Sequence, residues 1–126
     1  MRQKKYLKKI YVDVNVLYYY LTAHPLFGEK AKSLLSKYSG MLSTSVLTVW
    51  LLYVLTRLEN IDQILSELEI ELLPLTANII SAARNLKKPQ DFEDRIHLAT
   101  MLKHNIHVII SNDRDFDDLE NITRIF

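Results

Sequence analysis

Strand-like and helix-like segments alternate along the chain, and this alternation limits the possible fold more than any other feature of the sequence. Residues 10–21 are β-branched and aromatic, and we interpret them as a buried strand that runs into a loop. Further strands are expected at 41–44, 71–75, 108–111 and 119–126, and helices at 25–38, 45–58, 60–69, 76–87 and 91–104. Such an alternation predicts an α/β fold with a parallel sheet between helices.

Local signals mark the starts of two helices. Ser45 and Thr76 are expected to cap the helices that follow them. The segment TVWLLYVLTRL after Ser45 is apolar on nearly every face, which predicts a buried helix. The sequence has no internal repeat, low-complexity segment or interdomain linker, so its 126 residues are expected to form one domain.

Carboxylates stand at the ends of three apolar segments that are far apart in the sequence. Asp13 lies within the first strand, Asp94 lies near the start of a helix, and Asp113 and Asp115 follow a strictly apolar strand. A buried carboxylate without a partner is costly, and open α/β sheets form their sites beyond the carboxyl ends of the strands. Oxygen ligands from separate elements suit Mg²⁺ or Mn²⁺. The pattern therefore predicts a divalent-metal site.

Taken singly, these side chains also have ordinary structural explanations. An acid near a helix start, as at Asp94, interacts favourably with the helix dipole. Asp is common in loops such as the one that holds Asp113 and Asp115, and Asn15 can make local backbone hydrogen bonds. The prediction of a metal site therefore depends on the combination.

Composition excludes several other kinds of site. The chain has no cysteine, which rules out disulfides, thiolate zinc sites and cysteine nucleophiles. Two glycines cannot build a glycine-rich phosphate loop. No stretch reaches the ~18 apolar residues of a membrane span, and Asp13 and Asn15 interrupt the apolar run that a signal peptide would need. We expect a cytoplasmic protein without membrane contact.

Charge is unevenly distributed along the chain. Residues 1–9 form a basic N-terminal segment with five of the 16 Lys and Arg, and all 15 Asp and Glu lie after it. The net charge is only +1, which does not indicate a generally basic nucleic-acid-binding protein. We interpret the basic segment as a solvated tail. Its alternative is contact with RNA phosphates, for which Arg95 and Arg114 are further candidates.

Three motifs resemble those of the PIN domain family, the fold of many small prokaryotic ribonucleases, including VapC toxins. YVDVNVL resembles the family's first strand, FEDRIHLATML its Asp-containing helix, and VIISNDRDF the strand that leads into its Ser/Thr-Asn-Asp turn. The resemblance spans the chain. It implies a single PIN-like domain over residues 1–126, a three-layer α/β/α sandwich with a central, mainly parallel sheet. It also implies an Mg²⁺- or Mn²⁺-dependent endoribonuclease that cleaves single-stranded RNA.

The resemblance also implies roles for particular residues and partners. The expected catalytic metal ligands are Asp13, Asp94 and Asp113, with Asp115 as a further metal ligand beside them, and the expected supporting residues are Asn15 and Ser111. A homodimer and a small antitoxin protein are the implied partners, in addition to single-stranded RNA.

At one acid the chain departs from the family pattern. The family usually has a Glu in a helix that opens like TSVLTVWLL, whereas this chain has Trp50 there, or Leu51 if the register differs by one. The loss of this acid supports a second hypothesis, a catalytically weakened or inactive PIN-like domain that binds RNA or a protein. A third is a toxin-like protein whose main property is complex formation with an antitoxin.

Aromatic and histidine residues near the predicted site have two interpretations each. Tyr18, Tyr19 and Tyr20 follow the first strand, where they either stack on bases or belong to the core or a dimer surface. His97 falls three residues after Asp94 and is interpreted as a packed histidine, with a substrate contact as the alternative.

Overall fold

A five-stranded parallel sheet forms the centre of the computed structural model, which describes residues 8–126. The strands are β1 (Ile10–Val12), β2 (Leu42–Ser45), β3 (Glu71–Leu73), β4 (Val108–Ile110) and β5 (Thr123–Ile125). Their order is β3-β2-β1-β4-β5, and every neighbouring pair is parallel. The predicted α/β fold with a central, mainly parallel sheet is confirmed.

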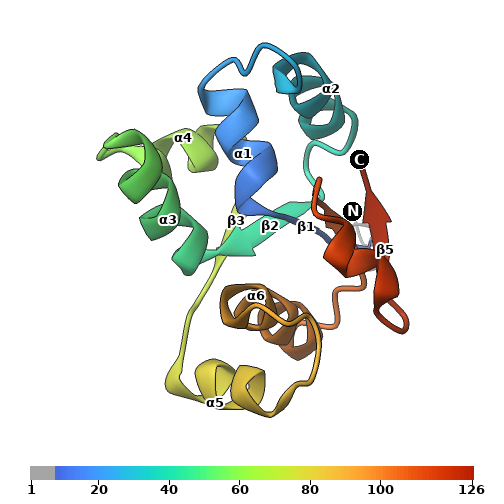
Figure 1. Ribbon diagram of the computed structural model, residues 1–126. Coiled ribbons are helices and arrows are strands. Elements are labelled where there is room, and N and C mark those ends of the chain that lie inside the picture. Colours follow the sequence, from blue (N-terminus) through green and yellow to red (C-terminus); the bar gives the residue numbers. More distant parts are fainter. Residues whose placement is uncertain (1–7) are drawn as a thin grey trace, which may run out of the picture.

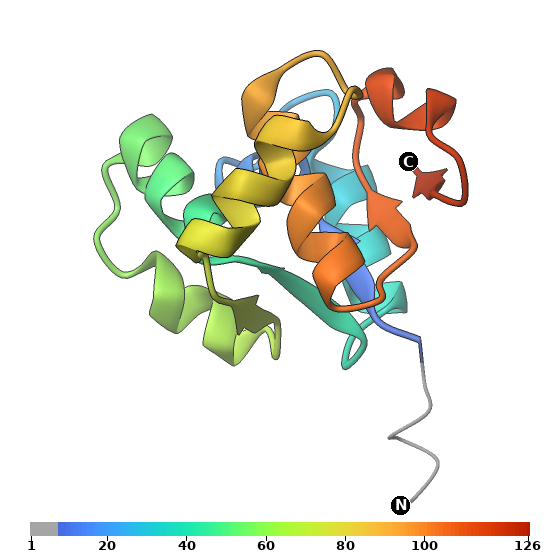
Figure 2. The same cartoon turned by 90° about the horizontal axis from the view of Figure 1, so that it is seen from below.

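Helices cover both faces of this sheet. Residues 8–126 contain α1 (Val14–Leu21), α2 (Gly28–Lys37), α3 (Val46–Thr56), α4 (Ile61–Glu67), α5 (Ala77–Asn85), α6 (Phe92–Lys103) and a short 3-10 helix, η2 (Arg114–Asp118). Helices α1 to α4 lie on one face, and α5 and α6 lie on the other (Figure 1). The view from below shows α5 and α6 across the front of the sheet (Figure 2). The arrangement is a three-layer α/β/α sandwich.

The central strand β1 contributes to the core on both faces. Ile10 and Val12 belong to the apolar cluster beneath α1 to α4, whereas Tyr11 belongs to the cluster that includes Met101 of α6. This division follows from the alternation of side chains along a strand. All three residues of β1 are buried, as expected for the middle of a parallel sheet covered on both faces.

The predicted strand over residues 10–21 is wrong beyond Val12. Asp13 ends the strand and caps α1, because its Oδ1 accepts a hydrogen bond from the backbone N–H of Val14 at 2.8 Å. Residues 14–21 then form a helix instead of a strand and loop. The sequence masked this change because Val and Tyr favour strands when they stand alone.

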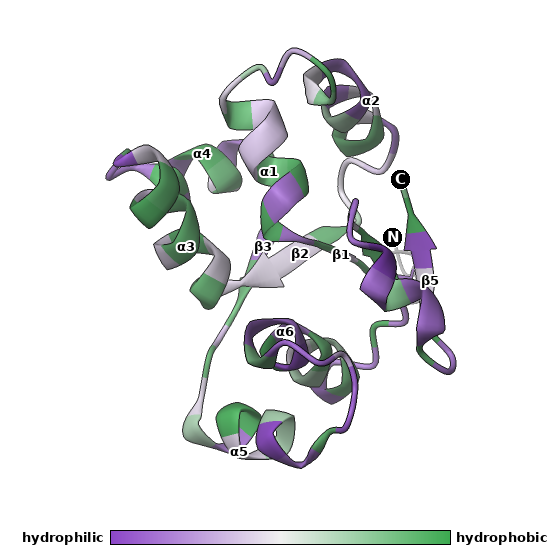
Figure 3. Ribbon diagram, viewed as in Figure 1, coloured by the Kyte–Doolittle hydropathy of each residue, from purple (hydrophilic) through white to green (hydrophobic). Residues whose placement is uncertain are grey.

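The predicted burial of α3 is also wrong. Ser45 caps this helix as predicted, since its Oγ accepts from the backbone N–H of Leu47 at 3.0 Å. Only Thr48 and Leu52 of the helix are fully buried, and Trp50 is 60% exposed. Val46, Val54 and Leu55 are exposed as well, so apolar residues lie on the solvent side of α3. The ribbon of this helix is mostly green in the hydropathy colouring (Figure 3).

The remaining elements agree with prediction to within a few residues, except the last strand, which begins only at Thr123. Thr76 caps α5 as predicted, with its Oγ1 accepting from Ile79 N–H at 3.2 Å. Within residues 8–126, no helix is long and apolar enough to span a membrane. Most of the predicted basic segment, residues 1–7, lies outside the described residues, and Lys9 forms an ion pair with Glu71.

Candidate metal centre

The carboxyl ends of β1 and β4 adjoin at the middle of the sheet and bring two polar residues together. Val12 pairs with Ile110 in the parallel ladder, so the residues that follow them, Asp13 and Ser111, are neighbours. The Ser111 hydroxyl donates a 2.6 Å hydrogen bond to Asp13 Oδ2. This is the edge of the sheet where open α/β folds place their sites.

Asn15, in the first turn of α1, contacts the same two residues. Its Nδ2 lies 3.5 Å from both Asp13 Oδ2 and Ser111 Oγ. Its Oδ1 accepts a 3.3 Å hydrogen bond from the backbone N–H of Asn112. The predicted supporting residues Asn15 and Ser111 thus lie directly against the Asp13 carboxylate, which is itself buried.

Asp94, Asp113 and Asp115 form a compact acidic group beside these residues. One carboxylate oxygen from each lies within 4.8 Å of the others. Asp94 is buried in the first turn of α6, whereas Asp115 is exposed on η2. Asp113 caps η2 by accepting from Asp115 N–H at 2.9 Å. The group therefore extends from the protein interior to the solvent, from two elements that are distant in sequence.

The electrostatics of this group favour a bound cation. Burial, followed by the charges of Asp13, Asp113 and Asp91, raises the pKa of Asp94 to about 7. Two unit charges 4 Å apart repel by about 4 kcal/mol at an effective dielectric constant of about 20. A divalent cation among the carboxylates would remove this repulsion.

Asp13 is linked to the acidic group through charge. Its oxygens are not part of the group within 4.8 Å, although its charge raises the pKa of Asp94. Burial raises the pKa of Asp13 itself, while His97 and the Ser111 hydroxyl oppose this rise. The carboxylate oxygens of all four acids are the ligand type that Mg²⁺ and Mn²⁺ prefer, and the exposed side of the group leaves room for water ligands. The residues present therefore fit such an ion.

A buried polar chain runs from the sheet to the helix that carries Asp94. His97 is fully buried, and its Nδ1 lies 2.6 Å from the hydroxyl of Tyr11. Its Nε2 lies 3.5 Å from Glu93 Oε2, and the interaction with His97 lowers the pKa of Glu93. The interpretation of His97 as a packed histidine is confirmed, since its burial leaves no surface for substrate.

The two arginines suggested as phosphate contacts, Arg95 and Arg114, lie in different surroundings. Arg95 donates to the backbone carbonyls of Ala83, Pro89 and Gln90 at 3.1, 3.2 and 2.6 Å. Through its Nε and Nη1 it therefore anchors the loop between α5 and α6, and a contact of Arg95 with phosphate stays a prediction. Arg114 is exposed at the start of η2.

The three tyrosines of α1 are half-buried and pack against the apolar cluster on that side of the sheet. Tyr19 packs its ring near Phe27 and Phe126, and its hydroxyl accepts a 3.0 Å hydrogen bond from Asn112 Nδ2. Of the two interpretations of these residues, packing in the core agrees with the structure.

Some residues around the site were not predicted from the sequence. Arg124 of β5 donates to the Ser111 carbonyl at 3.0 Å and to Asp117 Oδ1 at 2.7 Å. The Tyr11 hydroxyl contacts His97 Nδ1. The backbone N–H of Asn112, in the turn after β4, donates a hydrogen bond to Asn15 Oδ1. No local signal marks these residues, because each depends on a pairing between segments distant in sequence.

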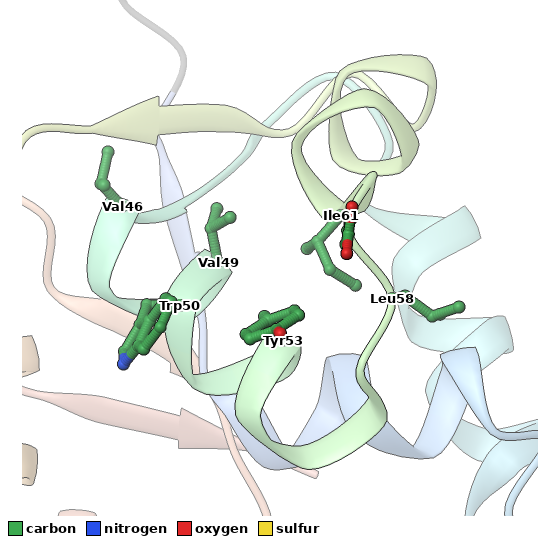
Figure 4. Close-up of a pocket in the computed structure, with 7 residues that line it drawn as sticks. Val46, Val49, Trp50, Tyr53, Leu58 and Ile61 are labelled. Carbon is green, nitrogen blue, oxygen red and sulfur yellow. The ribbon is translucent and has the colours of Figure 1, made fainter.

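Trp50 lines an apolar pocket on α3 and α4. The pocket has a volume of about 500 Å³ and is lined by Val46, Val49, Trp50, Tyr53, Leu58, Glu59 and Ile61 (Figure 4). Helix α3 contains no acidic residue, so it adds no carboxylate to the group on α6 and η2. The family's usual second acid has no counterpart at Trp50.

Comparison with known proteins shows the same fold. A toxin–antitoxin complex from Klebsiella pneumoniae is 18% identical, with 91% of this chain and 96% of that chain covered and a TM-score of 0.72. VapC20 from Mycobacterium tuberculosis, a toxin that cleaves the sarcin–ricin loop, is 18% identical, with 86% and 93% covered and a TM-score of 0.69. VapBC2 from Rickettsia felis, bound to a DNA fragment from its promoter, is 16% identical, with 92% and 96% covered and a TM-score of 0.61.

Sequence comparison gives the family. No curated protein matches the chain in sequence. The family model described as PIN domain matches residues 10–122, which include the strand of Asp13, the helix of Asp94 and the turn of Asp113. This protein therefore belongs to the PIN domain family.

Proposed function

We propose that this protein is a divalent-metal-dependent endoribonuclease that cleaves single-stranded RNA. The observation that carries the proposal is the group of Asp94, Asp113 and Asp115, whose carboxylate oxygens lie within 4.8 Å of one another. Membership of a nuclease family supports this reaction class.

Asp94, Asp113 and Asp115 would hold Mg²⁺ or Mn²⁺, with Asp13 adding negative charge at the buried side. When bound, the cation would orient the phosphodiester, favour ionisation of the attacking water and neutralise charge in the transition state. The protein's own task is positioning. Ser111 fixes Asp13, and the backbone N–H of Asp115 fixes Asp113, so these carboxylates need little reorganisation. The attacking water would form a new bond to phosphorus as the bond to the leaving ribose oxygen breaks, so no residue of the protein would have a covalent role.

The absence of an acid at Trp50 or Leu51 determines how strongly this site is expected to bind a cation. A site with one acid fewer attracts a cation less strongly, because each nearby carboxylate contributes Coulomb attraction. We therefore expect activity to require more metal than it would in a PIN domain that also has the usual Glu. Mn²⁺ is expected to support activity at lower concentration than Mg²⁺, because Mg²⁺ loses its water ligands reluctantly.

Cleavage of labelled single-stranded RNA tests the proposal. The wild-type protein is assayed with Mn²⁺, with Mg²⁺ and with EDTA, beside Asp94→Asn and a matched control, Asp62→Asn, at an exposed position on α4. We expect cleavage that needs the metal, survives Asp62→Asn and is lost in Asp94→Asn. Cleavage that persists in EDTA or in Asp94→Asn would show a contaminating nuclease. No cleavage by a folded sample would contradict the proposal.

A second candidate function is binding of a partner protein without catalysis. The exposed apolar surface of α3 favours it, because soluble domains rarely leave a large apolar patch uncovered. Two of the structural neighbours are toxin–antitoxin complexes, which makes a small antitoxin the partner to test. A short adjacent reading frame that encodes a DNA-binding protein would supply it. Copurification of the two proteins with Trp50 buried on binding would support this function.

The homodimer stays a prediction. A second copy of the chain is the other partner that the α3 surface suits, since a symmetric pair would bury the same apolar residues from each copy. Analytical ultracentrifugation of the wild-type protein and of Trp50→Lys tests whether this surface binds a second copy of the chain. A dimer that dissociates in the variant would assign this surface to self-association.

A further inference from the structure

We infer that a groove between the α5–α6 loop and η2 binds a backbone phosphate of the RNA strand next to the one that is cleaved. The inference rests on the proposed function, since the strand is its substrate. The groove has a volume of about 440 Å³ and is lined by Lys87, Lys88, Pro89, Gln90, Arg114, Asp115 and Asp118. This volume is within the ~300–1,000 Å³ of typical ligand sites.

Two basic side chains of the groove, Lys87 and Arg114, are available to bind an anion. Lys88 Nζ lies 2.9 Å from Asp118 Oδ2, so this pair is internally neutralised. Asp117, close to Arg114, is paired with Arg124. Among residues 8–126, neither Lys87 nor Arg114 has an ion pair within 4.0 Å. Lys and Arg side chains of this kind are the usual phosphate contacts of nucleic-acid-binding proteins.

Asp115 joins the groove to the candidate metal centre. Its side chain lines the groove, and its carboxylate is also a member of the group with Asp94 and Asp113. A strand with one phosphodiester at the carboxylates therefore has the groove directly beside it. The cation at the acids and the basic residues beyond Asp115 would bind successive phosphates of one strand.

The loop that supplies the lysines is held in place. Arg95 donates to the carbonyls of Pro89 and Gln90 in this loop and of Ala83 in the adjoining helix α5, and Pro89 is buried. The pair between Lys88 and Asp118 ties the loop to η2, and the two segments approach each other at one end of the molecule (Figure 2). Because the groove is already formed, little entropy is lost when a strand binds. Arg95 therefore positions the loop that carries Lys87 and Lys88.

Binding of labelled single-stranded RNA, measured by fluorescence anisotropy, tests the groove. All proteins carry Asp94→Asn so that the RNA stays intact. Lys87→Glu with Arg114→Glu is compared with a control of equal charge change, Lys32→Glu with Lys103→Glu, at exposed positions of α2 and α6. We expect affinity to fall about 100-fold in the groove variant, about tenfold for each lost contact. The slope of log affinity against log salt should become shallower by about 1.4, since each phosphate contact to a single strand contributes about 0.7. The control should change little.

If RNA affinity falls equally in the groove variant and in the control variant, the proposed phosphate site is wrong and only the net charge of the protein affects binding. Lys87→Gln with Arg114→Gln, a milder change, covers the case in which the Glu variant does not fold. Cleavage by otherwise wild-type proteins separates this inference from the proposed function. If the wild-type protein cleaves and the groove variant cleaves with the same KM, the groove is wrong and the nuclease stands. If the wild-type protein never cleaves but RNA binding needs Lys87 and Arg114, the groove stands and the nuclease is wrong.

Discussion

The hydroxyl of Ser111 donates a 2.6 Å hydrogen bond to the carboxylate of Asp13, 98 residues away in the sequence. The same oxygen accepts a 3.0 Å hydrogen bond from the backbone N–H of Asp113. One buried side chain thus joins the end of β1 to the turn that carries the acidic group. The relative position of the carboxylates depends on this contact.

Ser111→Ala should lower the free energy of unfolding by about 1–3 kcal/mol, because the buried Asp13 carboxylate loses a hydrogen-bond donor. Urea denaturation at neutral pH measures the change. The control is Ser33→Ala on the exposed side of α2, where a change within about 0.5 kcal/mol is expected. Equal, small effects in both variants would contradict the account of Asp13.

The metal-free protein should lose stability as the pH rises from about 4 to 7. Burial and neighbouring carboxylates raise the pKa of Asp94 from 3.8 to about 7, so in this range the folded state holds a proton that the unfolded state has released. The protonated Asp94 therefore contributes fully to the free energy of unfolding below about pH 4, and this contribution is lost above about pH 7. Urea denaturation in EDTA measures the free energy of unfolding across this pH range. It should change less with pH in Asp94→Asn than in the wild-type protein and in Asp62→Asn. Parallel profiles would contradict this assignment.

Tyr11→Phe should destabilise the fold by about 1–3 kcal/mol, because it leaves Nδ1 of the buried His97 without its 2.6 Å partner. Thermal or urea unfolding measures the loss, and Tyr38→Phe at a half-buried position is the matched control. If the two variants lose the same stability, the hydrogen bond between Tyr11 and His97 does not stabilise the fold.

Trp50 is the only tryptophan and is 60% exposed, so its fluorescence reports directly on the α3 surface. In dilute protein we expect emission typical of a hydrated indole and ready quenching by acrylamide. Trp50→Ala should change stability by less than about 1 kcal/mol, as expected for an exposed position. Protection from the quencher at every protein concentration would mean that this surface is already covered.

The sequence predicted the order of the elements because strand and helix patterns alternate and the caps at Ser45 and Thr76 are local. It did not predict α1, because the Val and Tyr residues after Asp13 favour strands and Asp13 is both a carboxylate of the site and the cap of this helix. The exposure of Trp50 could not be predicted, since an all-apolar helix does not show which of its faces a neighbour covers.

For the candidate site, the sequence indicated the acids on separate elements but not how close they lie. Carboxylate oxygens of Asp94, Asp113 and Asp115 lie within 4.8 Å of one another, whereas Asp13 is outside this group and accepts a hydrogen bond from Ser111. Parallel pairing of β1 with β4 sets this arrangement, and pairing is a tertiary property. The carbonyl partners of Arg95 could not be predicted, because they come together only in the folded loop.

Binding of Mn²⁺, followed by the electron paramagnetic resonance signal of the free ion, is the most direct test of the candidate metal centre. The account predicts saturable binding at neutral pH that also raises the melting temperature. Asp113→Asn should weaken binding by at least about tenfold, since it removes a charged oxygen from the acidic group. Asp62→Asn should bind as the wild-type protein does. Absence of saturable binding, or equal binding by Asp113→Asn and the wild-type protein, would contradict the account.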